Sequence, residues 1–145
     1  MVIPAYNEAS RVGDTVRAIF ALGQFSPPLQ VGDQEGVRVV VIDDGSEDGT
    51  ADAAQFAGAT VLRHAVNRGQ GAALQTGTAW ALEQGADCIV HFDADGQFDA
   101  ADIPRAVQHL NERGVDIVLG SRNLSLRGAS PANDEAISSG LLRFS

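Results

Sequence analysis

Two acidic residues with one residue between them, Asp93 and Asp95, follow a short apolar run from Cys88 to Val90. The run predicts a buried strand, and ligands of open α/β sheets bind where such strands end. Two neighbouring carboxylates repel each other, so both stay ionised only beside a cation. Oxygen ligands favour Mg²⁺ or Mn²⁺, which often take further ligands from substrate phosphates. We therefore hypothesise a divalent-metal site for a diphosphate; the alternative is an Asp-Gly turn that caps the next helix.

A second pair of carboxylates, Asp43 and Asp44, follows the β-branched run at residues 37–42. A nearly continuous apolar run of this kind is typical of a central parallel strand that is covered on both faces. Turn formation or helix capping explains one of the two acids. The second acid, at the mouth of the same sheet, favours a role in binding.

Gly69 and Gly71 lie where another helix is expected to begin. Glycine lets a ligand approach the backbone amides, and a helix N-terminus favours anions; a simple tight turn is the alternative. The stretch matches neither a P-loop nor a dinucleotide-binding fingerprint. Arg122, which follows the apolar run at 117–119, is placed to hold a phosphate or to neutralise the acids. His91 is expected to be packed and hydrogen-bonded rather than a metal ligand.

Strands and helices are expected to alternate along the chain. The expected strands cover residues 2–3, 37–42, 60–63, 87–92 and 117–119, and the expected helices cover 12–20, 51–57, 71–84 and about 102–113. Residues 24–36 and 123–134 are expected to be loops, and residues 137–144 to begin another helix. Right-handed crossovers then give an α/β fold with a mostly parallel, Rossmann-like sheet and helices on both faces. The strand ends that carry Glu8, the two acid pairs and Arg122 would converge on one edge.

Composition excludes several classes of protein. The chain has 145 residues, which suits one domain, and its net charge of −9 argues against a nucleic-acid binder that relies on a basic face. The lone cysteine, Cys88, cannot form an internal disulfide, so a reducing, cytoplasmic location is expected. No signal peptide or membrane-spanning run is visible. The short first strand and the apolar pattern that stops near Phe144 suggest a C-terminally truncated domain.

Five motifs together resemble the family 2 glycosyltransferases. They are Val-Ile-Pro-Ala-Tyr-Asn-Glu (2–8), Val-Ile-Asp-Asp-Gly-Ser-Glu-Asp-Gly-Thr (41–50), Asn-Arg-Gly-Gln-Gly-Ala-Ala (67–73), Phe-Asp-Ala-Asp-Gly-Gln (92–97) and Gly-Ser-Arg (120–122). Their order and spacing are most similar to the branch that contains dolichyl- and polyprenyl-phosphate mannose or glucose synthases. The resemblance covers about residues 2–122.

This resemblance implies a GT-A fold and a metal-dependent, inverting transfer of a sugar from a UDP- or GDP-sugar. The acceptor would be a polyprenyl phosphate, and the full-length protein would work at the cytoplasmic face of a membrane. Residues 1–122 would form the donor-binding domain, and residues 123–145 a mobile loop and the start of the acceptor side. Mg²⁺ or Mn²⁺ would be held by Asp93, Asp95 and Gln97. The residues implied to contact the nucleotide sugar are Pro4, Ala5, Tyr6, Glu8, Asp43, Asp44, Gly69, Gln70, Asp93, Ala94, Asp95 and Arg122.

The sequence departs from the family pattern at two points. Gln70 stands where the family often has lysine, so a cationic contact to the donor is missing. The family's catalytic base has no match before Ser145 and is expected beyond it. A non-catalytic nucleotide-sugar-binding module is therefore the alternative. A sugar nucleotidyltransferase ranks last, because Pro4 to Glu8 is not the glycine-rich, basic loop that such an enzyme needs after its first strand.

Overall fold

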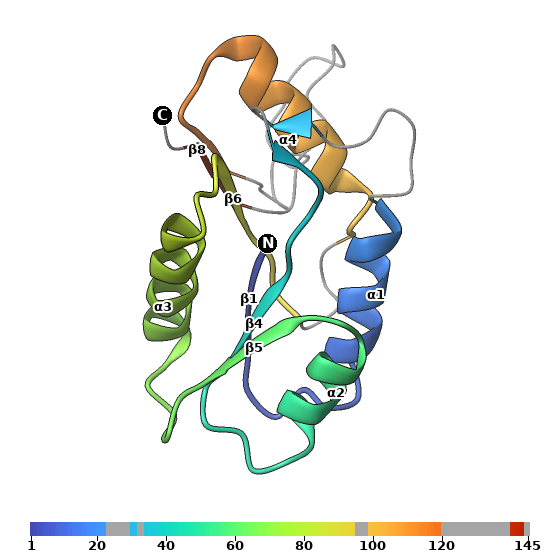
Figure 1. Cartoon of the computed structure of the whole chain (residues 1–145), viewed down its shortest axis with the longest axis vertical. Helices are drawn as coiled ribbons and strands as arrows, with labels where there is room; N and C mark the ends of the chain where they lie inside the picture. Colours follow the sequence, from blue (N-terminus) through green and yellow to red (C-terminus); the bar gives the residue numbers. More distant parts are fainter. Residues whose placement is uncertain (23–29, 32–33, 95–98, 120–139, 144–145) are drawn as a thin grey trace, which may run out of the picture.

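The computed structural model describes residues 1–22, 30–31, 34–94, 99–119 and 140–143 (Figure 1). Its helices are α1 (Val12–Leu22), α2 (Thr50–Phe56), α3 (Gln70–Glu83) and α4 (Asp102–Arg113). Its strands are β1 (Val2–Ala5), β2 (Gln30–Val31), β3 (Gln34–Glu35), β4 (Val40–Asp43), β5 (Thr60–Arg63), β6 (Cys88–His91), β7 (Ile117–Leu119) and β8 (Gly140–Arg143). Among these residues, no helix is long and apolar enough to cross a membrane.

The main sheet has the strand order β5-β4-β1-β6-β8-β7. β1 runs parallel to both β4 and β6, and β4 runs parallel to β5. The chain therefore builds outward from β1 through β4 to β5 and then crosses to the other side of β1 to form β6. This reversal of strand order leaves a crevice at the carboxyl ends of β1, β4 and β6, where open α/β sheets bind ligands.

Helices cover both faces of this sheet, as the sequence predicted. In β1, Ile3 belongs to the core that also holds α1, α2 and α4, whereas Val2 belongs to the core that holds α3. Figure 1 shows α3 on one side of the central strands and α1 and α2 on the other. β1 and β4 carry apolar side chains at successive positions because both faces of each strand are buried.

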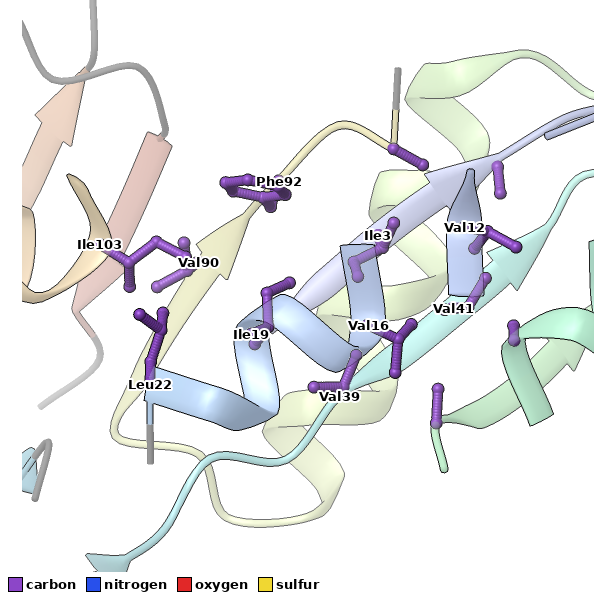
Figure 2. Close-up of a cluster of buried hydrophobic side chains, with 14 of the residues drawn as sticks. Ile3, Val12, Val16, Ile19, Leu22, Val39, Val41, Val90, Phe92 and Ile103 are labelled. Atoms are coloured by element: carbon purple, nitrogen blue, oxygen red, sulfur yellow. The ribbon is translucent and has the colours of Figure 1, made fainter. Parts of the chain in front are cut away.

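The core beneath α1 is built from side chains that recur at helical spacing. Val12, Val16 and Ile19 project from α1 onto Ile3 and Val41, and all of these side chains are fully buried (Figure 2). Burial of each such side chain stabilises the fold by about 1.5–3 kcal/mol. This packing fixes β1 and β4, whose ends carry the predicted site residues.

The core beneath α3 depends on Gly77. A Cβ atom at this position would lie 2.3 Å from Val2 Cγ1 and 3.1 Å from Ile42 Cγ1. No real side chain tolerates the shorter distance without a shift of its surroundings. Gly77 therefore lets α3 lie close to the sheet, and this closeness sets the position of the helix N-terminus at Gln70.

Two local expectations were wrong. Residues 140–143, expected to be helical, form β8, which pairs antiparallel with both β6 and β7. An apolar stretch this short does not distinguish strand from helix, and the backbone groups of β6 and β7 need hydrogen-bond partners. The expected loop at 24–36 contains the antiparallel pair β2 and β3.

Candidate functional site

A pocket of about 370 Å³ lies at the crevice between the ends of β1, β4 and β6 and the start of α3. The pocket collects most of the residues singled out in the sequence. Its lining is Pro4, Ala5, Tyr6, Glu8, Asp44, Asn67, Gly69, Gln70, Ala73, Asp93 and Ala94. Nine of the twelve predicted nucleotide-sugar contacts are in this lining. Asp43 is not part of it, and Asp95 and Arg122 lie outside the described residues.

The loop after β1 is fastened to the loop after β4. Asn7 adopts a positive φ of 54°, which asparagine tolerates better than most residues. Its backbone N–H donates to Ser46 Oγ (2.9 Å), and its Oδ1 accepts from the N–H of Glu47 (3.1 Å). The N–H of Glu8 donates to Thr50 Oγ1 at 2.9 Å. These bonds hold Tyr6, which is 47% exposed, and Glu8 at the mouth of the pocket.

Asp43 lies beneath this mouth and is completely buried. Its Oδ1 accepts from the N–H of Ser46 (2.9 Å), so this carboxylate closes the turn, as one of the two acids was expected to do. Its Oδ2 lies 3.1 Å from Arg63 Nε, close enough for an ion pair but without hydrogen-bond geometry. Asp43 therefore supports the turn and does not line the pocket.

Asp44 lines the pocket and holds the loop opposite. Its carboxylate accepts from the N–H groups of Arg68 (2.9 and 3.1 Å) and Gly69 (2.7 Å), and from His64 Nδ1 (2.6 Å). Burial raises the pKa of the Asp44 carboxyl, but these hydrogen bonds outweigh burial and hold the pKa below its ordinary value. Asp44 is therefore an anion that organises the entry to α3.

Asp93 sits at the end of β6 on the far side of the pocket, half-buried. Its Oδ1 accepts a hydrogen bond from Gln70 Nε2 at 2.8 Å, so the start of α3 and the end of β6 meet here. Asp93, a predicted metal ligand, thus lines the pocket, and its carboxylate oxygens are of the kind that Mg²⁺ and Mn²⁺ prefer.

The other two predicted metal ligands, Asp95 and Gln97, lie outside the described residues, and so does Arg122. Within the described ranges, no cluster of three or more His, Cys, Asp and Glu side chains is placed to hold a metal. His91 is hydrogen-bonded to Thr78 Oγ1 (2.8 Å), as expected. Burial lowers the pKa of His91 below its ordinary 6.5, and the charge of Asp93 partly opposes this shift.

Sequence reasoning missed His64 and Thr76. His64 is buried, and its Nε2 lies 3.0 Å from Thr76 Oγ1 on α3. Asp43 pairs with Arg63 across β4 and β5, so the next residues, Asp44 and His64, leave the two strands side by side. The sequence alone does not give this register, and it therefore does not show that these two residues are neighbours.

The mostly parallel sheet and the acid-lined pocket at its carboxyl edge place this protein among the α/β domains that bind ligands at a reversal of strand order. The family model "Glycosyl transferase family 2" matches residues 1–131, and the chain belongs to that family. This result confirms the resemblance on which the fold was predicted.

Two similar proteins carry names from the polyprenyl-phosphate branch. The chain is 34% identical over 128 residues to an undecaprenyl-phosphate mannosyltransferase of Micrococcus luteus, covering 85% of this chain and 47% of that protein. It is 31% identical over 132 residues to a polyprenol monophosphomannose synthase of Mycolicibacterium smegmatis, covering 84% of this chain and 44% of that protein. The chain thus spans about half the length of these relatives.

A solved structure with the same fold is glucosyl-3-phosphoglycerate synthase from Mycobacterium tuberculosis, in complex with Mn²⁺, uridine diphosphate and glucosyl-3-phosphoglycerate. The TM-score is 0.59 and the sequence identity 26%, over 81% of this chain and 41% of that one. This similarity agrees with the GT-A architecture. The roles assigned to individual residues of the pocket remain predictions.

Proposed function

We propose that this chain is the donor-binding part of a metal-dependent, inverting glycosyltransferase. Its donor is a UDP- or GDP-sugar, and its acceptor is a polyprenyl phosphate. The observation that carries the proposal is the single pocket that gathers Tyr6, Glu8, Asp44, Gln70 and Asp93 from four separate segments of the chain. Membership in glycosyl transferase family 2 supports the assignment of this pocket to a nucleotide sugar.

The chemistry of the pocket suits a diphosphate despite the acidity of the chain. Breaking the bond between the sugar and the nucleotide leaves negative charge on the diphosphate, which must be stabilised where it develops. Asp93, Asp95 and Gln97 would hold a divalent cation, which would supply that charge stabilisation when bound. Asp93 is oriented for this role by its hydrogen bond from Gln70.

The remaining pocket residues bind and orient the donor. Tyr6 offers a partly exposed aromatic surface, and Pro4 and Ala5 add apolar contact from β1. Gly69 has a φ of 89° and no side chain, so a ligand can approach the loop backbone closely. The names of the two polyprenyl-phosphate relatives support a lipid phosphate as the acceptor.

The proposal is tested with two matched variants, Asp93→Asn in the pocket and Asp116→Asn at an exposed position before β7. Binding of UDP-glucose and GDP-mannose is measured by equilibrium dialysis with and without Mn²⁺. We expect Asp93→Asn to weaken metal-dependent binding at least about tenfold, because it removes an anionic ligand. Asp116→Asn should bind as the unaltered chain does, and equal loss in both variants would contradict the proposal.

We expect the acceptor side and the family's catalytic base beyond Ser145, so transfer is tested on a longer protein. A protein that continues past Ser145 should move labelled sugar onto undecaprenyl phosphate but not onto the corresponding alcohol. Binding of the donor without transfer to any polyprenyl phosphate would instead favour the non-catalytic binding module.

A further inference from the structure

We propose that His64 is a positioning residue that holds the donor-facing loop at residues 67–70 in its binding shape. The proposal rests on the proposed function, because it assigns that loop to the nucleotide sugar. His64 does not line the donor pocket itself. It acts through Asp44, and the structure supplies each link of this connection.

The first link is the side chain of His64, which uses both ring nitrogens. Nδ1 is 2.6 Å from Asp44 Oδ1, at the end of β4, and Nε2 is 3.0 Å from Thr76 Oγ1, on α3. Its backbone N–H also donates to the carbonyl of Asp43 at 2.9 Å, which extends the β4–β5 ladder by one step. The ring is thus fixed between the sheet and α3, and the residue is only 9% exposed.

The second link is the Asp44 carboxylate, which reaches across to the loop. It accepts from the backbone N–H groups of Arg68 and Gly69, and no side chain of the loop takes part in these bonds. A loop held through its backbone amides keeps its shape only while the acceptor keeps its orientation. His64 supplies that orientation, because its ring fixes Asp44 Oδ1 and leaves Oδ2 directed at Gly69.

The third link is from the loop to the pocket. Asn67, Gly69 and Gln70 all line the pocket, and Gln70 continues into the hydrogen bond to Asp93. A chain of contacts therefore runs from His64 through Asp44 and the loop to the predicted metal ligand. Loss of His64 should release the loop and weaken donor binding although His64 touches no ligand.

Three variants separate positioning from general stability. His64→Leu removes both polar contacts of the ring, whereas His64→Asn keeps a short N–H donor at the position of Nδ1. Thr76→Val removes only the contact to α3 with little change of volume. Each variant is first checked for cooperative unfolding, so that only folded proteins are compared.

The first readout is amide hydrogen exchange at Arg68 and Gly69, which does not depend on any ligand. We expect faster exchange at both amides in His64→Leu, recovery in His64→Asn, and little change in Thr76→Val. The second readout is the affinity for UDP with Mn²⁺. We expect a loss of about tenfold in His64→Leu, equivalent to about 1.4 kcal/mol, and recovery of most of it in His64→Asn.

Unchanged exchange at Arg68 and Gly69 in His64→Leu would overturn the proposal. Faster exchange with unchanged UDP affinity would also overturn it, because the loop would then not position the donor. If the unaltered chain binds neither UDP nor GDP, the proposed function fails, while the exchange measurement still decides whether His64 holds the loop. The two failures are therefore distinguishable.

Discussion

The close packing of α3 on the sheet can be tested by adding a single methyl group. In Gly77→Ala the new Cβ would lie 2.3 Å from Val2 Cγ1 and close to two carbon atoms of Ile42, and both neighbours are fully buried. Overpacking of this kind costs about 1–3 kcal/mol. The same substitution favours the helix by about 1 kcal/mol, because alanine has the higher helix propensity.

Gly71 provides the matched control on the same helix. A Cβ at Gly71 would meet nothing within 4 Å, so Gly71→Ala carries the helix benefit without the clash. Gly71 lies in the first turn of α3 and gains no more helix propensity than Gly77 does in the interior, so the difference in stability between the two variants is a lower bound on the packing cost. We expect Gly71→Ala to stabilise the chain by about 0.4–1 kcal/mol, and Gly77→Ala to be less stable than Gly71→Ala by about 1–3 kcal/mol.

The free energy of unfolding is measured by urea denaturation, with thermal unfolding as a second probe. For a chain of this size, 1 kcal/mol corresponds to a shift in Tm of about 4 °C. Equal stability of Gly77→Ala and Gly71→Ala would refute the close approach of α3. In that case the placement of Gln70 beside Asp93 would also lose its structural basis.

Three further predictions concern charge. The folded-state pKa of His91 lies below the ordinary 6.5 because of burial, so the unfolded chain takes up a proton at a higher pH than the folded chain does. Stability should therefore decrease as pH falls below about 6.5, and His91→Gln should reduce this decrease, as measured by urea denaturation from pH 5 to 8. Burial also lowers the pKa of the Met1 amino group to about 6, and this group accounts for the pH dependence that remains in His91→Gln. Hydrogen bonds hold the pKa of Asp44 in the folded chain below its ordinary value of about 4. The ionised carboxylate therefore adds to the free energy of unfolding above about pH 4, and this stabilisation is lost as pH falls through the folded-state pKa. Asp44→Asn should lower stability at pH 7 and weaken the dependence of stability on pH in the acid range. Gln70→Lys introduces the cation that family members often carry at this position. The affinity for UDP without metal should therefore rise at low salt and fall as added salt screens the new charge. An affinity that does not depend on salt would contradict this prediction.

The fold was largely predictable because its strands are buried on both faces. Continuous apolar runs mark β4 and β6, and glycine ends α4, where Gly114 adopts a left-handed conformation with φ 59°. The short strands β2, β3 and β8 were not predictable. Two to four residues carry too little periodicity, and β8 exists because β6 and β7 each leave an edge that it can pair with.

The pocket was predictable where residues follow strand ends, since the carboxyl ends of parallel strands meet at one edge. Asp44 and Asp93 illustrate this rule, and both line the pocket. The sequence did not reveal how Asp43 and Asp44 divide their roles, because that depends on which carboxylate faces the interior. The role of His64 was not predictable for a related reason, because its partner Asp44 is 20 residues away in the sequence and becomes its neighbour only in the folded sheet.

The most direct test of a metal-dependent donor site is calorimetric titration of the chain with UDP and with GDP, each with and without Mn²⁺. We expect one of the two nucleotides to bind with an affinity that depends on Mn²⁺ and is reduced by Asp93→Asn. The nucleotide that binds would also identify the class of donor. Binding with an affinity that does not depend on Mn²⁺, or no binding of either nucleotide by the folded chain, would contradict a metal-dependent donor site.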